Sequence, residues 1–547
     1  MDLLNIHSLK ELKNIMDTPI DLGKHKPLVL IGGFIGSTVV CTMIYNHFKQ
    51  NVPLQRRIKE YVFKVFRKVP IVKRKVEEER IKTLENFKEE FLKMTSDIQE
   101  FPSLPTKGLK KDEVMALSKM CLKTGEFKWE DGKQSGTVYN GDEELTKLIS
   151  NVYQLYAWSN PLHPDTFPGV RKMEAEIVRM TCNLFNGNRD SVGCVTSGGT
   201  ESIILAVKAY RDYGRNVLGI DKPVIVVPQT AHAAFDKAAE ILDIHIRHVK
   251  VDPITKRVNM RAMKSAICSR TVLLVGSAPQ FPHGSMDPIP DIAALGIRYG
   301  IPVHVDACLG GFLICFAKEA GFSLPYDFDF CVEGVTSISA DTHKYGYAPK
   351  GTSVLLYSKH EYRSHQWFTV TDWPGGVYAT ACIGGSRSGA VIAACWASLM
   401  YYGMDGYVEA TRKIMETTKY IVNGLKNING IEIVGEPDVS VVAFDSPIFN
   451  IYHVFDGLKK KGWNLNALQF PSCIHLCVTL LTTQPGKADE FVNDIEELAQ
   501  ELIANPRPDE GGSAALYGMA QSIPDRKVID VICQAYLDSI YVTKDPA

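Results

Sequence analysis

The sequence predicts an α/β protein in which a large domain with a mostly parallel sheet precedes a smaller α+β domain. A single membrane-spanning helix is expected before both. Three observations support this prediction. Between Thr196 and Tyr357, short apolar runs alternate with helical patterns, and after about Gly403 the composition shifts. Near the N-terminus, nineteen consecutive residues carry no charge.

The uncharged segment runs from Pro27 to Tyr45, close to the roughly 20 residues that a helix needs to cross a bilayer. Its glycines and polar flanks fit a buried core helix less well. No small-residue cleavage site follows it, which favours an uncleaved anchor over a signal peptide. Ten Lys and Arg against one acid lie between Lys49 and Lys75. Because positive residues stay on the cytoplasmic side, we expect residues 1–26 to be a lumenal tail and the remainder to be cytosolic.

Residues 46–130, between the predicted span and the large domain, are basic at first and then amphipathic. From Arg56 to Phe66, basic and apolar residues alternate. This pattern fits an interfacial helix on an anionic membrane and, equally, a solvated helix face. From Glu77 to Glu100, apolar residues recur at helical spacing, so we expect a linker helix that the prolines after Glu100 end.

The predicted large domain covers residues 131–405. Its apolar runs fit strands that are covered on both faces, and therefore a mostly parallel sheet. The predicted strands are Val224–Val227, Val272–Gly276, Val303–Asp306, Ser337–Ala340 and Val354–Tyr357, and the predicted helices lie near Ala233–Leu242, Met260–Cys268 and Ile289–Tyr299. Ligands gather at the carboxyl ends of strands in such sheets, so polar motifs at these ends mark the candidate site.

The predicted small domain covers residues 406–547. A helix is expected first, then short strands and a further helix, which is typical of an α+β domain. The segments are Tyr407–Leu425, Glu432–Val434, Val439–Phe444, Ile474–Thr479 and Lys487–Ile503.

Composition narrows the class of protein. The chain has 547 residues, 45% of them apolar, which suffices for a large core. Its net charge of -1 creates no global field directed at nucleic acid. Thirteen cysteines are scattered without C-x-x-C pairs or Cys/His clusters at zinc spacing, so we expect reduced thiols and no metal site.

The first motif with chemical content is Val195–Ser202, where two glycines precede an apolar helix. Glycine here, at Gly199, lets the backbone approach an anion. The Thr200 hydroxyl and the helix N-terminal amides can then bind a phosphate. A plain strand-to-helix turn with an N-cap threonine explains the same residues nearly as well.

Two further polar residues follow predicted strands. Asp306 places a carboxylate at the functional edge of the sheet, where it can pair with a pyridine nitrogen. His232 begins a helix after the strand Val224–Val227, where its ring can stack on a cofactor ring. Taken alone, the aspartate is more often a helix cap and the histidine more often a satisfied cap.

The stretch Ser337–Gly346 carries Lys344 directly after His343, in a polar turn that follows a strand. A lysine so placed can hold an aldehyde cofactor as a Schiff base. Any single lysine is usually a surface residue. The order of phosphate loop, stacking histidine, ring aspartate and His-Lys pair, each at a strand end, is specific. We therefore predict an enzyme that depends on pyridoxal 5′-phosphate (PLP).

These motifs resemble those of the fold-type I PLP enzymes of the decarboxylase-like group, and within it the family of sphingosine-1-phosphate lyases. The similarity runs from the predicted anchor nearly to the C-terminus. The matching segments are Asn160–Gly169, Cys194–Glu201, His304–Gly311, Ser339–Gly346 and Gln521–Arg526.

The resemblance implies roles for the cofactor-binding residues. Lys344 is the lysine that bonds the cofactor, Asp306 pairs with the pyridinium nitrogen and His232 stacks on the ring. The cofactor phosphate is held by Gly199, Thr200 and His343, and by Gly385 and Ser386 from a partner subunit.

The resemblance also implies roles toward the substrate. Lys350 matches the family's second lysine, which binds the substrate phosphate. Tyr139 and His163 match positions that line the substrate entrance. Tyr378 is a candidate for proton handling near the substrate hydroxyl.

By resemblance, we expect a homodimeric enzyme of the endoplasmic-reticulum membrane with its active sites at the subunit interface. Its reaction is the retro-aldol cleavage of a phosphorylated sphingoid base to a long-chain aldehyde and phosphoethanolamine. An amino-acid decarboxylase of the same fold shares the His-Lys motif but has no reason for a bilayer span. A membrane-tethered scaffold without activity would show damage at Lys344, Asp306 or the glycine loop, and all are intact.

Overall fold

The computed structural model describes residues 70–125, 127–508 and 526–543. The predicted span Pro27–Tyr45, the lumenal tail before it and the stretch Arg56–Phe66 lie outside these residues. Within the described part of the chain, none of the helices is both long and apolar enough to span a bilayer.

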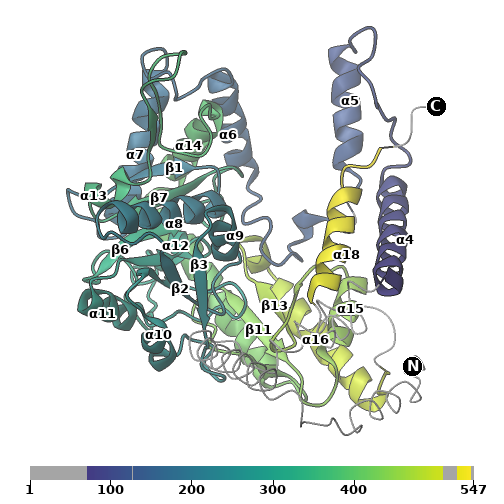
Figure 1. The fold of residues 1–547 in the computed structure, drawn as a ribbon. Helices are drawn as coiled ribbons and strands as arrows, with labels where there is room; N and C mark the ends of the chain where they lie inside the picture. Colours follow the sequence, from purple (N-terminus) through teal and green to yellow (C-terminus); the bar gives the residue numbers. More distant parts are fainter. Residues whose placement is uncertain (1–69, 126, 509–525, 544–547) are drawn as a thin grey trace, which may run out of the picture. The chain divides into compact units, whose positions relative to one another are not determined.

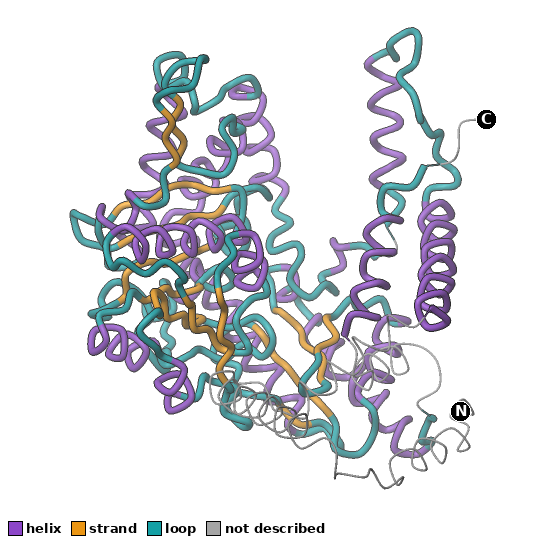
Figure 2. Tube along the Cα trace, in the orientation of Figure 1, coloured by secondary structure: helices purple, strands orange, loops and turns teal. Residues whose placement is uncertain are grey.

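A seven-stranded sheet forms the centre of the α/β part, with helices packed around it (Figures 1 and 2). Its strand order is β1-β7-β6-β5-β4-β2-β3. All neighbouring strands are parallel except at β7, which runs antiparallel to both β6 and β1. The strands are β1 (Val192–Thr196), β2 (Val224–Pro228), β3 (His245–Val249), β4 (Thr271–Ser277), β5 (Val303–Asp306), β6 (Val335–Ala340) and β7 (Ser353–Tyr357). The prediction of a mostly parallel sheet is therefore confirmed.

Alternation along the strands explains why this sheet is buried on both faces. Successive side chains of a strand point to opposite faces. In β7, Leu355 and Tyr357 join one hydrophobic cluster, whereas Val354 and Leu356 join the other. The sheet therefore needs a layer of helices on each side.

The helices divide between these two faces. One face is covered by α8 (Gly199–Asn216), α9 (Ala234–Ile241) and α13 (His360–Ser364) (Figure 1). The helices that pack on or beyond the other face are α7 (Pro168–Leu184), α10 (Met260–Ala266), α11 (Ile289–Tyr299), α12 (Gly311–Ile314) and the first half of α14 (Gly389–Lys426), with α6 (Glu143–Tyr156) against α14.

The topology gathers several strand ends at one edge of the sheet. β1 points the same way as β6 because both are antiparallel to β7. The carboxyl ends of β1, β2, β5 and β6 therefore share one edge. The loops that leave this edge carry the predicted phosphate loop, His232, Asp306 and Lys344.

The C-terminal part is built on a second sheet, antiparallel throughout, in the order β10-β11-β13-β12. Its elements are β10 (Glu432–Ile433), β11 (Val441–Asp445), α15 (Ile451–Lys460), β12 (Asn466–Leu468), β13 (Cys473–Cys477) and α16 (Lys487–Ala504). The chain enters this part through α14, which Gly403 interrupts with φ 55° and ψ -173°, a conformation that favours glycine. The predicted helix Tyr407–Leu425 is the second half of α14.

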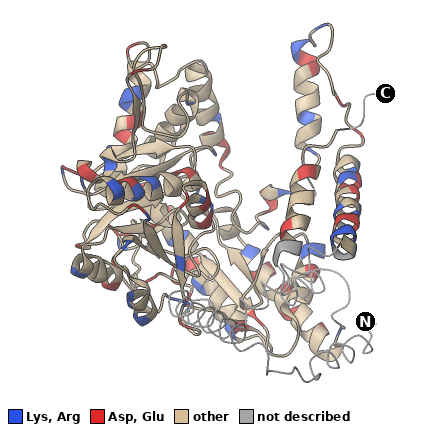
Figure 3. Cartoon of the chain, in the orientation of Figure 1, with Lys and Arg blue, Asp and Glu red and all other residues tan. Residues whose placement is uncertain are grey.

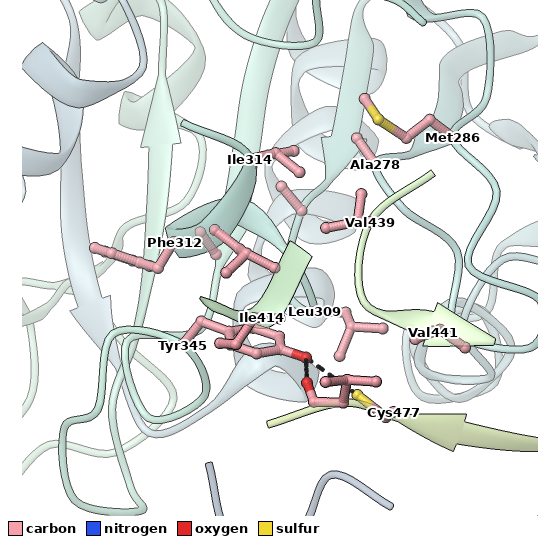
Figure 4. Packing of buried hydrophobic residues seen from close by; sticks show 14 of the residues in the cluster. Ala278, Met286, Leu309, Phe312, Ile314, Tyr345, Ile414, Val439, Val441 and Cys477 are labelled. Atoms are coloured by element: carbon pink, nitrogen blue, oxygen red, sulfur yellow. Dashed lines mark hydrogen bonds between the residues drawn. The ribbon is translucent and has the colours of Figure 1, made fainter. Parts of the chain in front are cut away.

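One tyrosine ties the two parts together. Tyr345 is fully buried, and its hydroxyl donates to the carbonyl of Val478 (2.6 Å) and is hydrogen-bonded to Ser440 Oγ (2.7 Å). Figure 4 shows its ring in the hydrophobic core, with the hydroxyl also reaching the Cys477 sulfur. The residue after Lys344 is thus fixed to the C-terminal part.

The remaining described elements are α4 (Pro70–Met94), α5 (Lys111–Leu122), α18 (Arg526–Ser539), the hairpin β8 (Phe368–Val370) with β9 (Tyr378–Thr380), and two 3₁₀ turns, η1 (Trp129–Asp131) and η2 (Leu481–Thr483). Both signs of charge alternate along α4 (Figure 3), where Arg74 pairs with Glu78 one turn away. The Tyr536 ring of α18 packs on Phe87 and Phe91, so α4 has the apolar stripe predicted for the linker helix.

Trp463 provides a test of the C-terminal core. It is 1% exposed, its ring packs 4.8 Å from Phe491, and its Nε1 donates to Asp494. We expect Trp463→Ala to lower the free energy of unfolding by about 3–5 kcal/mol, because it leaves a large cavity and removes a hydrogen-bond donor from Asp494, which keeps its ion pair with Lys461. Urea unfolding measures this loss. The control Ile254→Ala, at a side chain that is 79% exposed, should change stability by less than about 0.5 kcal/mol. Equal effects of the two substitutions would contradict the assigned core.

Candidate active site

A cavity of about 360 Å³ opens at the carboxyl edge of the large sheet. Four segments that are distant in sequence line it, and each follows a strand. The lining residues are Ser197, Gly198, Gly199, Thr200, Glu201, Ile203, His232, Cys308, Asp341, His343 and Lys344. Five of the predicted site residues, Gly199, Thr200, His232, His343 and Lys344, therefore meet in one place.

Lys344 projects from the turn after β6 and is paired with a carboxylate. Its Nζ lies 2.9 Å from Oδ2 of Asp341, and its backbone amide donates to the Asp341 carbonyl (3.2 Å). Burial disfavours the charged amine, but the negative charge of Asp341 outweighs this effect and raises the pKa of Lys344. The lysine is therefore an ammonium ion when nothing is bonded to it.

Asp341 is the functional residue that the sequence analysis missed. It is 4% exposed, and besides Lys344 it faces His343 Nε2 at 3.6 Å. Burial raises its pKa, but the charge of the nearby Lys344 outweighs burial, so the pKa falls below its usual value. Within the described chain, its second oxygen, Oδ1, is buried without a hydrogen-bond partner. The motif Asp341–Lys344 offered a signal, since residues three apart in a turn face each other.

His343 is held as a neutral imidazole. Its Nδ1 lies 2.5 Å from the Thr352 carbonyl, which can only accept, so the proton sits on Nδ1. Burial lowers the pKa of His343, and the attraction of Asp341 does not reverse this. The ring edge faces Gly198, where an added Cβ would lie 3.8 Å from Cε1. A neutral His343 can therefore line an anion site without a charge of its own.

One side of the phosphate loop is held by hydrogen bonds, and its other side faces the cavity. Thr196 and Ser202 are 2.7 Å apart through their hydroxyls, and Ser202 lies 2.9 Å from the Ser353 hydroxyl of β7. Gly199 begins α8 so close to Asp341 that an added Cβ would lie 2.8 Å from Oδ1. The N-terminal amides of α8, together with the exposed Thr200, are thereby presented to the cavity, where they can bind a phosphate.

Glu201 connects this loop to a second one. Its Oε2 accepts from the backbone amide and the hydroxyl of Ser197, and its Oε1 accepts from the amide of Ile383 (2.9 Å). The loop after Ile383 carries Ser386 and lines a neighbouring cavity of about 550 Å³ that Thr200 also lines. Arg387 forms a bidentate ion pair with Glu174 and so stabilises the same loop. Glu201 therefore sets the spacing of two candidate phosphate-binding loops.

Asp306 and His232 occupy the edge as predicted. Asp306 ends β5, is 6% exposed, and accepts the amide of Cys308 (3.1 Å). His232 follows β2, and its Nδ1 accepts the amide of Ala234 (3.1 Å), which fixes the imidazole ring against the start of α9. His232 is exposed and lines the cavity. His232 therefore caps the start of α9, as the alternative interpretation held, and it also lines the cavity.

Lys350 and Tyr139 form a contact of their own beside Lys344. The Lys350 ammonium lies 5.0 Å from the centre of the Tyr139 ring, a cation–π distance. Burial and the like charge of Lys344 lower the pKa of Lys350. Burial raises the pKa of Tyr139, so its phenol keeps its proton. Neither residue lines the 360 Å³ cavity.

The remaining predicted residues gather outside this cavity. His163 lies in the loop between α6 and α7, where Asn160 donates to the Ser386 hydroxyl (3.1 Å). Tyr378 begins β9, and an added Cβ at Gly385 would lie 2.5 Å from its hydroxyl. The structure thus brings Tyr378 close to the loop of Gly385 and Ser386, with His163 in the segment whose Asn160 contacts that loop, and none of the four residues lines the cavity of Lys344.

The residues at the cavity fit PLP. A phosphate matches the open start of α8, and an aldehyde matches the buried amine of Lys344. The orphaned Oδ1 of Asp341 marks a place where a bound polar group would complete the hydrogen bonding. His232 lines the same space.

Comparison with known proteins places the chain. Residues 102–446 match the family of pyridoxal-dependent decarboxylases by its conserved domain. The sphingosine-1-phosphate lyase of Drosophila melanogaster is 51% identical over 515 residues, which cover 94% of this chain and 93% of that protein. The chain belongs to the sphingosine-1-phosphate lyase family.

Solved structures agree with this membership. The sphingosine-1-phosphate lyase of Burkholderia pseudomallei aligns with a TM-score of 0.73 and 38% identity, over 75% of this chain and 95% of that one. Glutamate decarboxylase from Lactobacillus brevis, at 20% identity and a TM-score of 0.65, covers 75% of this chain and 97% of its own and shares the fold. The matching family is pyridoxal-dependent, so PLP is the cofactor of this protein.

The link through Glu201 is testable by cofactor affinity. Glu201→Gln removes the charge that accepts the Ser197 and Ile383 donors, so both loops lose a fixed position. We expect PLP to bind at least about tenfold more weakly, because hydrogen bonds to charged groups contribute about 1.5–3 kcal/mol. Titration of the apoprotein with PLP measures this. Glu240→Gln, an exposed acid on α9, is the matched control and should bind PLP like the wild type. Unchanged affinity in Glu201→Gln would remove Glu201 from the site.

Proposed function

We propose that this protein cleaves the C2–C3 bond of phosphorylated sphingoid bases, with PLP, to give a long-chain aldehyde and phosphoethanolamine. One observation carries the proposal. Two lysines stand side by side in the candidate site, Lys344 in the cavity and Lys350 over the Tyr139 ring. The first suits the cofactor aldehyde, and the second suits the phosphate of the substrate.

PLP supplies an electron sink for the pair of electrons that C2 retains when its bond to C3 breaks. The chain's own residues hold and orient it. The start of α8 and Thr200 would bind its phosphate, His232 would stack on its ring, and the carboxylate of Asp306 would pair with the ring nitrogen. The position of Asp306 at the end of β5, next to Cys308 of the cavity, supports this assignment.

Lys350 and Tyr139 are suited to a phosphate dianion. Burial and the neighbouring ammonium of Lys344 make the charge of Lys350 unfavourable, and a bound dianion compensates for both. Tyr139 keeps its proton and therefore acts as a hydrogen-bond donor rather than as a base. A compact ammonium with a hydroxyl donor beside it is a good phosphate site.

Two protons move in the reaction. The hydroxyl on C3 loses its proton to a base, so that C3 becomes the carbonyl carbon of the aldehyde, and Tyr378 is our candidate for proton handling near this hydroxyl. C2 must gain a proton in exchange. Lys344 stands ready as an ammonium ion for this second transfer, since Asp341 favours its charged form.

We further propose that the enzyme is a homodimer with shared sites, anchored by one span in the endoplasmic-reticulum membrane with its catalytic part in the cytosol. Exposed apolar side chains near Tyr378 support the dimer, among them Trp373 (54% exposed) and Val377 (78%), with Trp158 (93%) on the loop before His163. The uncharged segment Pro27–Tyr45 and its basic flank support the anchor. A substrate with a long alkyl tail resides in the bilayer, which gives the anchor a purpose.

Product analysis tests the reaction. Purified protein with PLP should release a long-chain aldehyde from sphingosine 1-phosphate, and Lys344→Ala should release none. The same preparation should release no carbon dioxide from amino acids, as a decarboxylase of this fold would. Carbon dioxide without aldehyde would replace the lyase by a decarboxylase, and a visible absorbance of bound PLP with neither product would sink both.

Mixing two inactive variants tests the shared site. Lys344→Ala and Tyr378→Phe each inactivate one contribution, and a heterodimer regains one intact site if Tyr378 serves the partner's lysine. Random mixing should then restore about a quarter of the wild-type activity, because half of the dimers are heterodimers with one of two sites intact. Activity that stays at the level of the separate variants would place Tyr378 in the same subunit as the Lys344 it serves.

A further inference from the structure

We propose that Asp341 is a positioning residue that keeps Lys344 protonated whenever this lysine is free of the cofactor, so that Lys344 can return a proton to C2 of the departing product. The inference rests on the proposed function for its last step only. The pairing of Asp341 with Lys344 can be tested without any substrate.

The geometry makes Asp341 the counter-ion of Lys344. The two residues lie three apart in the turn after β6, and Oδ2 of Asp341 is 2.9 Å from Nζ of Lys344. The hydrogen bond between their backbones holds this spacing. The Asp341 side chain is 3% exposed and that of Lys344 21% exposed. A carboxylate buried to this degree is costly without a cation, so the two charges are stable only together.

The other groups that face Lys344 do not offer a second negative charge. Cys308 comes from the loop after β5, Tyr139 from the segment before α6, and Cys477 from the end of β13. Burial raises the pKa of all three, so each is neutral near pH 7. His343 on the same turn is neutral, and Lys350 is positive. Among these groups, therefore, Asp341 is the one that favours an ammonium.

The stored proton has a defined use in the cleavage. When C2–C3 breaks, the hydroxyl proton of C3 goes to a base and the bonding pair stays with C2. The proton on Nζ then moves to C2, where that pair forms the new C–H bond, and Lys344 is left as a neutral amine. A neutral amine is the form that can bond the cofactor aldehyde again and free phosphoethanolamine. Asp341 thus keeps the proton available at one stage without taking part in the bond changes.

The first experiment measures cofactor uptake by the apoprotein as a function of pH. Only the neutral amine of Lys344 reacts with the PLP aldehyde, so the uptake rate reports its protonation. Wild-type uptake should still rise steeply with pH at pH 9. In Asp341→Asn, burial and Lys350 act without an opposing charge, so the rate should level off at lower pH and exceed that of the wild type at least about tenfold at pH 7, which corresponds to a pKa lower by one unit or more.

Asp329→Asn is the matched control. Asp329 is 5% exposed like Asp341, but it lies before β6 at the opposite end of the strand, where Asn186 donates to it. Its uptake profile should match that of the wild type, and the titration of PLP itself is common to all three proteins. Identical profiles for Asp341→Asn and wild type would overturn the proposal. If Asp341→Asn does not fold, the wild-type profile still decides, since uptake that levels off below about pH 8 contradicts a stored proton.

The second experiment concerns the loaded enzyme. In Asp341→Asn, kcat for sphingosine 1-phosphate should fall and its basic limb should move to lower pH by a unit or more, with KM nearly unchanged, because the proton donor is lost earlier as pH rises. Asp341→Glu should recover part of kcat. A raised KM with an unshifted pH profile would show a merely structural role. If wild-type protein releases no aldehyde at all, the proposed function fails, whereas the uptake profiles still decide the role of Asp341.

Discussion

The buried ion pair between Lys344 and Asp341 is the constraint on which the candidate site depends. A lysine that must react as an amine is placed where an ammonium is expensive, and the carboxylate 2.9 Å away makes that charge tolerable. The pair in turn requires space: Gly199 stands where any side chain would strike Asp341, so α8 can begin directly above it. The phosphate-binding end of α8 and the reactive amine are therefore brought to one cavity by a single packing arrangement.

Tyr345, the residue after Lys344, holds the turn after β6 rigid. Tyr345 buries its ring in the core, and its hydroxyl is hydrogen-bonded to Ser440 and Val478, which belong to the C-terminal part. The position of Lys344 is therefore determined by both parts of the chain, and any shift of one part against the other would displace Nζ. A lysine side chain has many rotamers, so an anchored neighbour reduces the conformational freedom that catalysis would otherwise have to overcome.

Much of this arrangement follows from sequence patterns, and the exceptions have physical reasons. Strands that are apolar throughout were predictable because both of their faces are covered, but β3 carries His245, Arg247 and His248 as an edge strand and lacks that signature. β1 contains Gly193, which the close approach of the Leu355 carbonyl demands and which weakens a strand pattern. Lys344 and Asp306 were predictable from strand ends. Asp341 was missed although it lies three residues before Lys344, because a carboxylate in a turn acquires its partner only when the turn closes.

The pKa values of Lys344 and Lys350 shift in opposite directions in one environment, and this difference suits the two lysines to different roles. Both lose hydration, which disfavours charge on either of them. Asp341 reverses the effect at Lys344, whose pKa rises, but it is too weakly coupled to Lys350 to do so, and the pKa of Lys350 falls. The proton held on Lys344 suits a group that must donate to carbon. Lys350 is a cation that lacks a counter-charge, so it can attract an anion. The substrate phosphate can supply that missing charge, so the asymmetry created by one carboxylate separates the chemical lysine from the binding lysine.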